Sequence, residues 1–262
     1  MADESMIRNL AAQANAIWPQ EILFFTRYGL PANCRIADIG CGTGEITSRL
    51  AAFYPDAEVI GVDILETSVA YARKHHAGLA PRVQFTQGDA FGLALPVGQF
   101  DLVLCRHLTQ CVPEPEKVLA ELKRITKPGG WLHVLSEDYG MLHFIPGGID
   151  PDTFWHEAVT RFAQNTGTDQ RIGRRTWTLL HQLQIEELSV DYVTVDTQRV
   201  ARGTFAAILE AWRDGYTEAI SRHSQLHLQE VRAYFDYIIG SIRNPDHYAV
   251  WHIPVISGRR GR

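Results

Sequence analysis

Short apolar runs alternate with helical patterns of apolar residues through the middle of this 262-residue chain. Five of these runs are predicted as strands, at residues 35–39, 58–63, 82–86, 100–105 and 131–135. Between them, apolar side chains recur every three or four positions, which favours helices. Because parallel strands joined through helices adopt right-handed crossovers, the alternation predicts a parallel sheet with helices on both faces.

The segments on either side of this region are mainly helical. One or two helices are predicted over the first 30 residues, with Pro19 restarting the chain. After residue 140, helical patterns follow at about 154–162, 174–184, 204–222 and 224–243. Two further strands are predicted at 188–195 and 248–256, and Pro254 places the end of the second at a sheet edge or a bulge.

Composition limits the partners of the chain. Its 30 acidic and 25 basic residues give a formal net charge of −5, which disfavours nucleic acid as the main partner. Apolar runs fall far short of the ~20 residues of a membrane span, and no secretory signal is visible. The four cysteines form no CxxC pair, so we expect free thiols that are buried or line a pocket. These features predict a cytoplasmic protein with no nucleic-acid or membrane partner.

A glycine cluster, Gly40, Gly42 and Gly44, follows the first predicted strand and opens a helix. Glycines at such a turn allow unusual backbone dihedrals and close approach of a ligand. A dinucleotide-binding turn would place its third glycine where Glu45 stands, and a carboxylate suits a pyrophosphate poorly. No Lys or Arg lies between residues 38 and 47. The turn therefore favours a ligand that is neutral or positively charged there, and it disfavours a nicotinamide oxidoreductase.

Two acidic residues follow the next two strands. Asp63 closes the second strand, where a carboxylate can accept hydrogen bonds from both hydroxyls of a ribose. Asp89 follows the third strand in the step Gly88-Asp89-Ala90, where it can contact an adenine edge or act as a helix N-cap. Because these residues lie at the carboxyl ends of parallel strands, we expect them at one edge of the sheet, where open α/β folds bind ligands.

Together these motifs resemble class I S-adenosylmethionine-dependent methyltransferases. The resemblance rests on the run Asp38-Ile39-Gly40-Cys41-Gly42-Thr43-Gly44, on Asp63, on the step at Asp89, and on the later runs at 100–107 and 127–130. It covers residues 35–137 and is strongest with small-molecule enzymes of the ubiquinone and menaquinone type. It implies a Rossmann-like, mostly parallel sheet of seven strands in the order 3-2-1-4-5-7-6, the last strand antiparallel. Helical cap elements would complete this α/β fold.

The resemblance also implies a cofactor and a set of residues that bind it. The cofactor is S-adenosyl-L-methionine, with S-adenosyl-L-homocysteine as its product. The residues implied are Asp38, Gly40, Gly42, Gly44, Asp63, Ile64, Asp89, Ala90, Cys105 and Arg106. The glycines would lie under the methionine and ribose, Asp38 near the amino group, and Ile64 against the adenine.

Candidates for catalysis follow the fourth and fifth strands. His107 comes directly after strand four, and its near-neutral intrinsic pKa suits a general base. The alternative is a histidine that is hydrogen-bonded into the wall of the cofactor site. Glu137 and His143, after strand five, are the other candidates. His223 and His227 lie four residues apart but lack a third ligand nearby, so no metal site is predicted.

We expect methyl transfer to a small-molecule acceptor by in-line displacement, with a protein that chiefly positions the reactants. The alternative is a non-catalytic S-adenosylmethionine-binding or regulatory protein on the same fold. Residues 1–33 are predicted to cover the cofactor site and residues 34–262 to form the methyltransferase domain. Helical insertions at about 147–185 and 203–243 would shape the acceptor pocket, although the second would equally serve as a homodimer contact.

Overall fold

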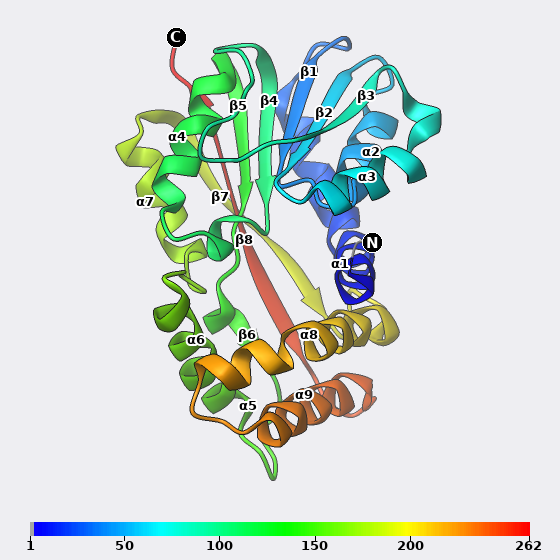
Figure 1. Cartoon of the computed structure of the whole chain (residues 1–262), viewed down its shortest axis with the longest axis vertical. Coiled ribbons are helices and arrows are strands. Elements are labelled where there is room, and N and C mark those ends of the chain that lie inside the picture. The colour runs from blue at the N-terminus through cyan, green and yellow to red at the C-terminus, as the bar shows by residue number, and fades with distance from the viewer. Residues whose placement is uncertain (1–2) are drawn as a thin grey trace.

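A mostly parallel sheet with helices on both faces forms one end of the molecule in the computed structural model, which describes residues 3–262 (Figure 1). Its first strands are β1 (Arg35–Ile39), β2 (Glu58–Asp63), β3 (Val83–Gln87), β4 (Phe100–Arg106) and β5 (Thr126–Leu135). The later strands are β6 (Leu142–His143), β7 (Ile185–Asp196) and β8 (Val250–Arg260). All neighbouring pairs among β1–β5 are parallel, as the strand-helix alternation predicts.

The order of the strands confirms the predicted arrangement. The sheet runs β3-β2-β1-β4-β5-β8, and β7 pairs with the far side of β8. Strand β8 lies between β5 and β7 and runs antiparallel to both of them. The two-residue strand β6 was not predicted, and it pairs with the start of β8.

Pro254 lies inside β8 rather than near its end, which corrects the prediction. The pairing of β5 with β8 stops at Val255, and the pairing of β6 with β8 covers only Val250 and Trp251. Pro254 therefore faces the gap between β5 and β6, where a missing N–H costs the sheet little.

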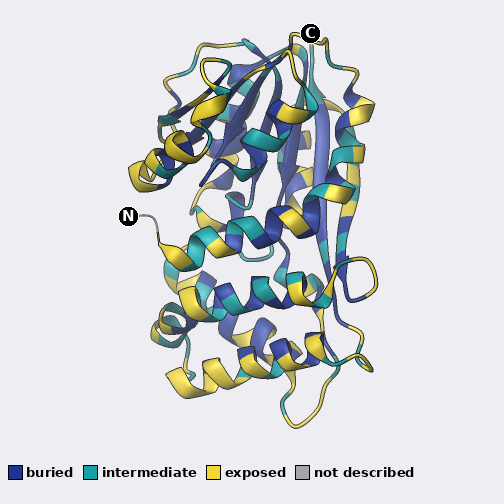
Figure 2. Ribbon diagram, turned by 90° about the vertical axis from the view of Figure 1, so that its right-hand side faces the viewer, coloured by how far each residue is buried: buried dark blue, intermediate teal, exposed yellow. Residues whose placement is uncertain are grey.

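Helices α2 (Glu45–Phe53) and α3 (Glu66–His75) cover one face of the sheet, together with the end of α1 (Glu4–Phe25). Helices α4 (Pro115–Ile125) and α7 (Gly173–Gln182) cover the other face. In α4 the buried positions recur at Val118, Leu119, Leu122 and Ile125, so one apolar stripe packs on the sheet. Buried residues accordingly follow the strands and the inner sides of the helices (Figure 2).

Helix α1 is a single helix, so Pro19 does not restart the chain as expected. Asp3 caps its start by accepting a hydrogen bond from the backbone N–H of Ser5 at 2.8 Å. Proline at position 19 removes the helical bond to the carbonyl of Asn15, but Asn15 is exposed and water can satisfy that carbonyl. Burial of Ile17 and Phe25 on the same side of the helix outweighs the cost.

A second group of helices lies beyond the carboxyl ends of the parallel strands, where β7 and β8 extend (Figure 1). Its members are α5 (Pro151–Thr153), a π-helical stretch (Phe154–Ala158), α6 (Val159–Thr166), α8 (Arg202–His223) and α9 (Leu228–Arg243). Their shared core contains the fully or almost fully buried rings of Trp155, Phe205, Trp212, Phe235 and Trp251. In residues 3–262 no helix has the length and apolar character that crossing a membrane requires.

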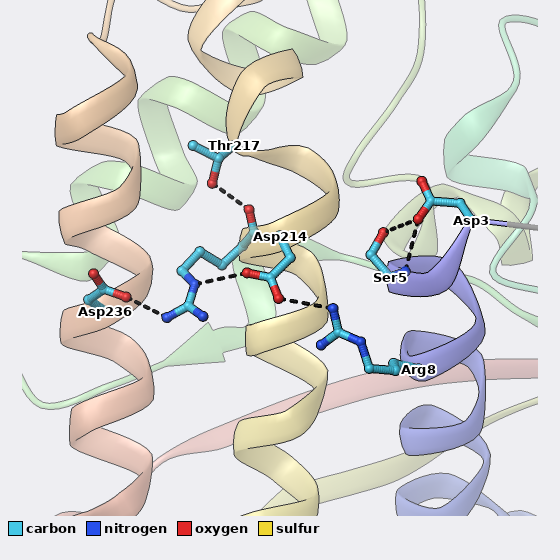
Figure 3. Close-up of polar contacts among 7 residues, drawn as sticks. Asp3, Ser5, Arg8, Asp214, Thr217 and Asp236 are labelled. Carbon is cyan, nitrogen blue, oxygen red and sulfur yellow. Dashed lines mark hydrogen bonds and ion pairs between the residues drawn. The ribbon is translucent and has the colours of Figure 1, made fainter.

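An ion-pair chain joins three helices on the surface of this region (Figure 3). Arg8 of α1 contacts Asp214 of α8 at 3.0 Å, and Arg213 lies between Asp214 at 3.2 Å and Asp236 of α9 at 2.7 Å. The chain is partly exposed, so each pair contributes only about 0–1 kcal/mol. Its geometric effect is to hold the first turns of α1 against α8.

Candidate active site

The glycine turn lies at the carboxyl end of β1, directly under α1. Gly40, Gly42 and Gly44 all have positive φ angles, of 79°, 53° and 82°, a conformation that other residues rarely adopt. A Cβ atom on Gly42 would lie 2.7 Å from Cδ1 of Leu10 in α1. The backbone of the turn is therefore unusual in shape, and the side chain of Leu10 covers it closely at Gly42.

Asp63 joins the glycine turn to the tip of β2. Its Oδ2 accepts a hydrogen bond from the N–H of Gly42 at 2.8 Å, and its Oδ1 accepts one from Leu65 at 2.9 Å. Ile64 lies next to it with 59% of its surface exposed. The carboxylate is thus fixed in orientation beside an exposed apolar side chain, as a ribose and an adenine at this edge would require.

The step after β3 is connected to the same edge. The N–H of Gly88 donates to the carbonyl of Asp63 at 2.9 Å. Asp89 is exposed and accepts from the N–H of Phe91 at 2.9 Å, while Ala90 is partly buried behind it. No helix follows Asp89 before β4, so the helix N-cap alternative is wrong. A turn fixed by Asp89 takes its place.

A small cavity lies between the glycine turn and α1, and it brings opposite charges close together. Its walls include Asp38 and Gly40 of the turn region, Arg106 of β4, and Leu10 and Gln13 of α1. Asp38 accepts a hydrogen bond from the hydroxyl of Thr47 at 2.6 Å. Burial raises the pKa of Asp38 to about 6 despite this bond.

Arg106 is held by a buried network that sequence reasoning missed. Its Nε donates to Oε1 of Glu21 in α1 at 2.7 Å, and Nε2 of His133 lies 2.9 Å from the same oxygen. The hydroxyl of Tyr28 lies 2.7 Å from Nδ1 of His133. Burial opposes ionisation of Glu21, but Arg106 and His133 outweigh it and lower the pKa of Glu21 to about 2. Glu21 lies four residues after Ile17 and four residues before Phe25, on the buried side of α1. This spacing would have predicted a buried carboxylate.

The network leaves Nη2 of Arg106 buried without a hydrogen-bond partner. Arg106 lines the small cavity together with Asp38. A buried guanidinium donor is rarely left unsatisfied in a folded protein. The charges of Asp38 and Arg106 match those of an ammonium and a carboxylate group, although Glu45 adds a second carboxylate to the wall. The cavity has a volume of only about 30 Å³, so the methionine portion of S-adenosylmethionine would fit only after wall residues such as Leu10 move.

Two predicted site residues lie elsewhere. Cys105 points into the core packed against α4, with no exposed surface, and lines neither cavity. His143 lies in β6 with 58% of its side chain exposed, and its nearest ionic partner is Asp152 at 3.9 Å. The prediction that Cys105 lines the cofactor finds no support here, and His143, predicted as a candidate for catalysis, lies outside both cavities. The reason is that side chains alternate across β4, and that the chain turns away from the sheet edge after Tyr139.

His107 and Glu137 come together from the ends of β4 and β5. Nδ1 of His107 lies 2.6 Å from Oε1 of Glu137, and the N–H of His107 donates to the carbonyl of Leu135 at 3.1 Å. His107 has a φ angle of 53°, a backbone conformation that is uncommon for residues other than glycine. Nε2 of His107 and Oε2 of Glu137 are buried without partners.

A larger cavity of about 410 Å³ adjoins this pair. Its walls come from α1, from the segments after β4 and β5, and from α6, α8 and α9. Sequence reasoning did not single out the polar lining residues Asn9, Gln13, Gln110 and Gln170. Leu10, Gln13 and His107 line both cavities, so the two sites meet at these three side chains.

The cysteines agree with the expectation of free thiols. Cys34, Cys41 and Cys105 are buried, and Cys111 lines the larger cavity. Unlike the other three cysteines, Cys111 is an exposed residue. Within residues 3–262 no group of three metal-ligating side chains is assembled.

This combination of a Rossmann-like sheet, a glycine turn, a carboxylate at the end of β2 and two adjoining cavities defines the class I methyltransferase architecture. Residues 30–194 match the family model described as the methyltransferase domain. The chain therefore belongs to the methyltransferase domain family, which confirms the resemblance that the motifs indicated.

Several curated proteins are similar over part of the chain. The probable methyltransferase ltbC of Aspergillus luteorubrus is 34% identical over 130 residues, which cover 46% of this chain and 45% of that protein. Trans-aconitate 2-methyltransferase of Deinococcus radiodurans is 39% identical over 100 residues, covering 38% and 36%. Demethylmenaquinone methyltransferase of Thermus thermophilus is 38% identical over 101 residues, covering 38% and 46%. The chain thus spans less than half the length of these relatives.

Solved structures share the fold at low sequence identity. Haemonchus contortus phosphoethanolamine N-methyltransferase 2, in complex with S-adenosyl-L-methionine, superposes with a TM-score of 0.62 at 17% identity, covering 98% of this chain and 56% of that one. Geranyl diphosphate C-methyltransferase of Streptomyces coelicolor gives 0.56 at 15% identity, covering 93% and 79%. The cyclase SpnF gives 0.57 at 19% identity, covering 98% and 82%.

Proposed function

We propose that this chain transfers a methyl group from S-adenosyl-L-methionine to a small-molecule acceptor. The observation that carries the proposal is the junction of two cavities at His107. The smaller one adjoins the glycine turn and has complementary charges in Asp38 and Arg106, and the larger one has room for an acceptor. Membership of the methyltransferase domain family and the cofactor-bound structural neighbour support it.

Residues at the sheet edge would hold the cofactor. The Asp38 carboxylate would accept hydrogen bonds from the ammonium group, and Nη2 of Arg106 would donate to the carboxylate. Gly40, Gly42 and Gly44 would lie against the methionine and ribose portions. In this structure the side chain of Leu10 presses on Gly42, so that side chain would shift when the cofactor binds. The adenosine portion would extend toward the end of β2, where Asp63 and Ile64 lie. It would also reach the turn after β3, which contains Asp89 and Ala90.

When bound, the cofactor supplies an electrophilic methyl group on a positively charged sulfur. The chain's own residues hold the acceptor in line with that methyl group and take a proton from the acceptor. We infer that His107, which lines both cavities, is the base through Nε2, the ring nitrogen without a hydrogen-bond partner. Glu137 bonds Nδ1 of the ring, which keeps the proton there and leaves the lone pair on Nε2.

Helix α8 and helix α9 supply Trp212, Tyr216, Ile220 and Phe235 to the wall of the larger cavity. This placement favours the expectation that residues 203–243 shape the acceptor pocket over the expectation that they serve a homodimer. Residues 1–33 would cover the cofactor through Leu10 and Gln13. A cytoplasmic location remains our prediction from composition alone.

The second candidate is a protein that binds the cofactor without methyl transfer. The cyclase SpnF has the same fold and is named for another reaction. Calorimetric titration with S-adenosylmethionine, followed by a labelled-methyl assay against a panel of metabolites, separates the two candidates. Binding with labelled product supports the proposal, and binding without methyl transfer to any acceptor in the panel favours the second candidate.

A further inference from the structure

The first turns of α1 form a wall that the two cavities share. Leu10 and Gln13 line both cavities, and Met6 and Asn9 also line the larger one. Leu10 covers the glycine turn so closely that a Cβ atom on Gly42 would lie 2.7 Å from its Cδ1. The small cavity, at about 30 Å³, has room for only a few water molecules. The methionine portion of the cofactor therefore fits only after this wall has moved.

The end of α1, by contrast, is anchored to the sheet. Glu21 forms a buried ion pair with Arg106 of β4 at 2.7 Å, so moving it would leave two buried charges unpaired. Gln20 bonds the backbone of Thr194 in β7 twice, since its amide nitrogen donates to the carbonyl at 2.8 Å and its amide oxygen accepts from the N–H at 3.1 Å. Phe25 is buried in the core. The last turns of α1 are therefore fixed, and any movement must occur before them.

Pro19 lies directly before this anchored part and weakens the helix there. It has no N–H to bond the carbonyl of Asn15, and prolines are common sites of helix kinks. A surface hollow of about 390 Å³ adjoins both residues. The apolar side chains that α1 buries before Pro19 are three alanines and Ile17, so the first part of the helix loses little packing when it tilts. Leu10 lies nine residues before Pro19, so a tilt of about 15° moves it by about 3–4 Å.

The start of α1 is held by contacts with α8 at the surface (Figure 3). Arg8 pairs with Asp214 at 3.0 Å, and both side chains are partly exposed. Arg213 pairs with the same carboxylate at 3.2 Å and keeps it in place. Ser5 packs on Gly215, where a Cβ atom would lie 2.9 Å from the Oγ of Ser5. Because an exposed ion pair contributes little, these contacts hold α1 against α8 and still release it readily.

We propose that residues 4–18 form a gate, which tilts about Pro19 to admit the cofactor and is held closed by the Arg8–Asp214 ion pair. This rests on the proposed function, because the gate controls entry to that same cofactor site. The closed gate is the state described above, with α1 packed on α8. In the open state the side chain of Leu10 leaves the glycine turn, and the small cavity widens enough for the methionine portion.

The gate also links the two cavities. Trp212 and Tyr216, on either side of Asp214 in α8, line the larger cavity together with Met6 and Leu10 of the gate. Separation of α1 from α8 therefore opens the larger cavity together with the small one. Cofactor and acceptor enter and leave through one opening, and the closed gate keeps both away from solvent.

A reversible crosslink tests the gate. Ser5→Cys combined with Gly215→Cys places two thiols in contact, because the ideal Cβ position on Gly215 lies 3.6 Å from Cβ of Ser5, within the span of about 3.5–4.5 Å in disulfides. Binding of S-adenosylhomocysteine is measured by surface plasmon resonance on one immobilised sample, first reduced, then oxidised, then reduced again with dithiothreitol. We expect association in the oxidised state to be slower by about 100-fold or more, and the reduced state to bind like the natural chain.

This double variant is compared with itself, so misfolding would not explain a reversible loss of binding. The natural chain, taken through the same cycle of oxidation and reduction, is the control for its own four cysteines. Its association rate should stay constant.

Arg8→Ala tests the ion pair that holds the gate closed. We expect the association rate of S-adenosylhomocysteine to rise by about 2-fold to 5-fold, because an exposed pair shifts the balance between the closed and the open state only slightly. Arg27→Ala is the matched control. Arg27 pairs with Asp191 of β7 on the anchored side of Pro19, and its side chain is 49% exposed against 45% for Arg8. This control should leave the association rate unchanged.

Each arm has a result that would count against the gate. Equal association rates in the oxidised and reduced double variant would overturn the proposal, since the cofactor would then enter without movement of α1. Failure of the two thiols to crosslink would contradict the closed contact between α1 and α8. Equal rates in Arg8→Ala and Arg27→Ala would show that the ion pair does not hold the gate. Absence of S-adenosylhomocysteine binding by the natural chain would instead contradict the proposed function itself.

Discussion

Nδ1 of His107 lies 2.6 Å from Oε1 of Glu137, and His107 stands where the smaller and the larger cavity meet. The carboxylate fixes which nitrogen carries the proton and how the ring is oriented. In the proposed mechanism, Nε2 of His107 accepts a proton from the acceptor. Two residues 30 positions apart in the sequence form one functional unit because β4 and β5 are parallel neighbours.

Replacing His107 tests the role of the His107–Glu137 pair in methyl transfer. We expect His107→Asn to lower kcat by about 100-fold to 10,000-fold, the usual contribution of a general base, with little change in cofactor affinity. Glu137→Gln should lower kcat less and shift the pH profile, because the amide still contacts Nδ1 without its charge. His143→Asn is the control and should keep full activity, since His143 is exposed and outside the cavity. Equal loss in the His107 and His143 variants would contradict the assignment.

Asp38 predicts how cofactor affinity depends on pH. Its pKa is raised to about 6 by burial, so a fall in pH through 6 protonates the carboxylate. A neutral Asp38 no longer attracts an ammonium group, and we expect the affinity for S-adenosylmethionine to weaken below about pH 6. Calorimetry between pH 5 and pH 8 measures this dependence. The Asp38→Asn variant should bind S-adenosylmethionine weakly at every pH, and its affinity should no longer fall below about pH 6. If the affinity of the natural chain were constant between pH 5 and pH 8, this role of Asp38 would be refuted.

Glu21 predicts acid sensitivity of the fold. Its pKa falls from 4.5 to about 2 on folding, so its ionised form stabilises the folded state above about pH 4.5. That stability is lost as the pH falls from 4.5 toward 2, because the unfolded chain takes up the proton first. Urea unfolding at pH 7 should show that Glu21→Gln costs about 3–5 kcal/mol, since Arg106 then stays buried without its counter-ion.

Glu66→Gln is the matched control for Glu21→Gln. Glu66 pairs with Arg73 at 2.9 Å, but both side chains are about half exposed. Its loss should cost only about 0–1 kcal/mol. Similar losses of stability in the two variants would show that the network around Glu21 does not stabilise the fold.

Gly42→Ala tests the shape of the glycine turn. Its φ of 53° costs about 1–2 kcal/mol for a residue with a Cβ, and the new atom would meet Leu10 at 2.7 Å. We expect a lower melting temperature together with a loss of cofactor affinity of about 10-fold or more. Gly203→Ala in α8 has free space around the new atom and should be neutral or slightly stabilising. If Gly42→Ala left the affinity for the cofactor unchanged, the glycine turn would not be part of the cofactor site.

The sheet was largely predictable from the sequence, and particular residues explain why. The predicted bounds of β1 and β2 are confirmed at both ends, because the Gly29–Pro31 break, the glycine turn and the Pro55-Asp56 turn interrupt the apolar pattern close to them. The carboxyl ends of parallel strands must meet at one edge, so Asp38, Asp63 and Asp89 could be placed near one another. The prediction that α1 breaks at Pro19 was wrong, because burial of one side of the helix outweighs the local effect of the proline.

The acceptor cavity could not be predicted in the same way. Its walls combine Asn9, Gln110, Trp155 and Trp212, which lie on four separate segments, and no local pattern relates their positions. Only the packing of α1 and α8 on the end of the sheet brings them together. His143 shows the same limit, since the path of the chain after β5 decided whether it reached the cavity.

Calorimetric titration with S-adenosylhomocysteine tests the central claim most directly, because it asks whether the glycine turn and its carboxylates form a cofactor site. For the natural chain, binding should occur at one site per chain. Asp63→Ala should weaken it by about 10-fold or more, since it loses an acceptor for the ribose and the bond to Gly42. Glu58→Ala at the exposed start of the same strand should bind normally. Absence of binding by the natural chain, or equal binding by the Asp63→Ala variant, would contradict this account of the site.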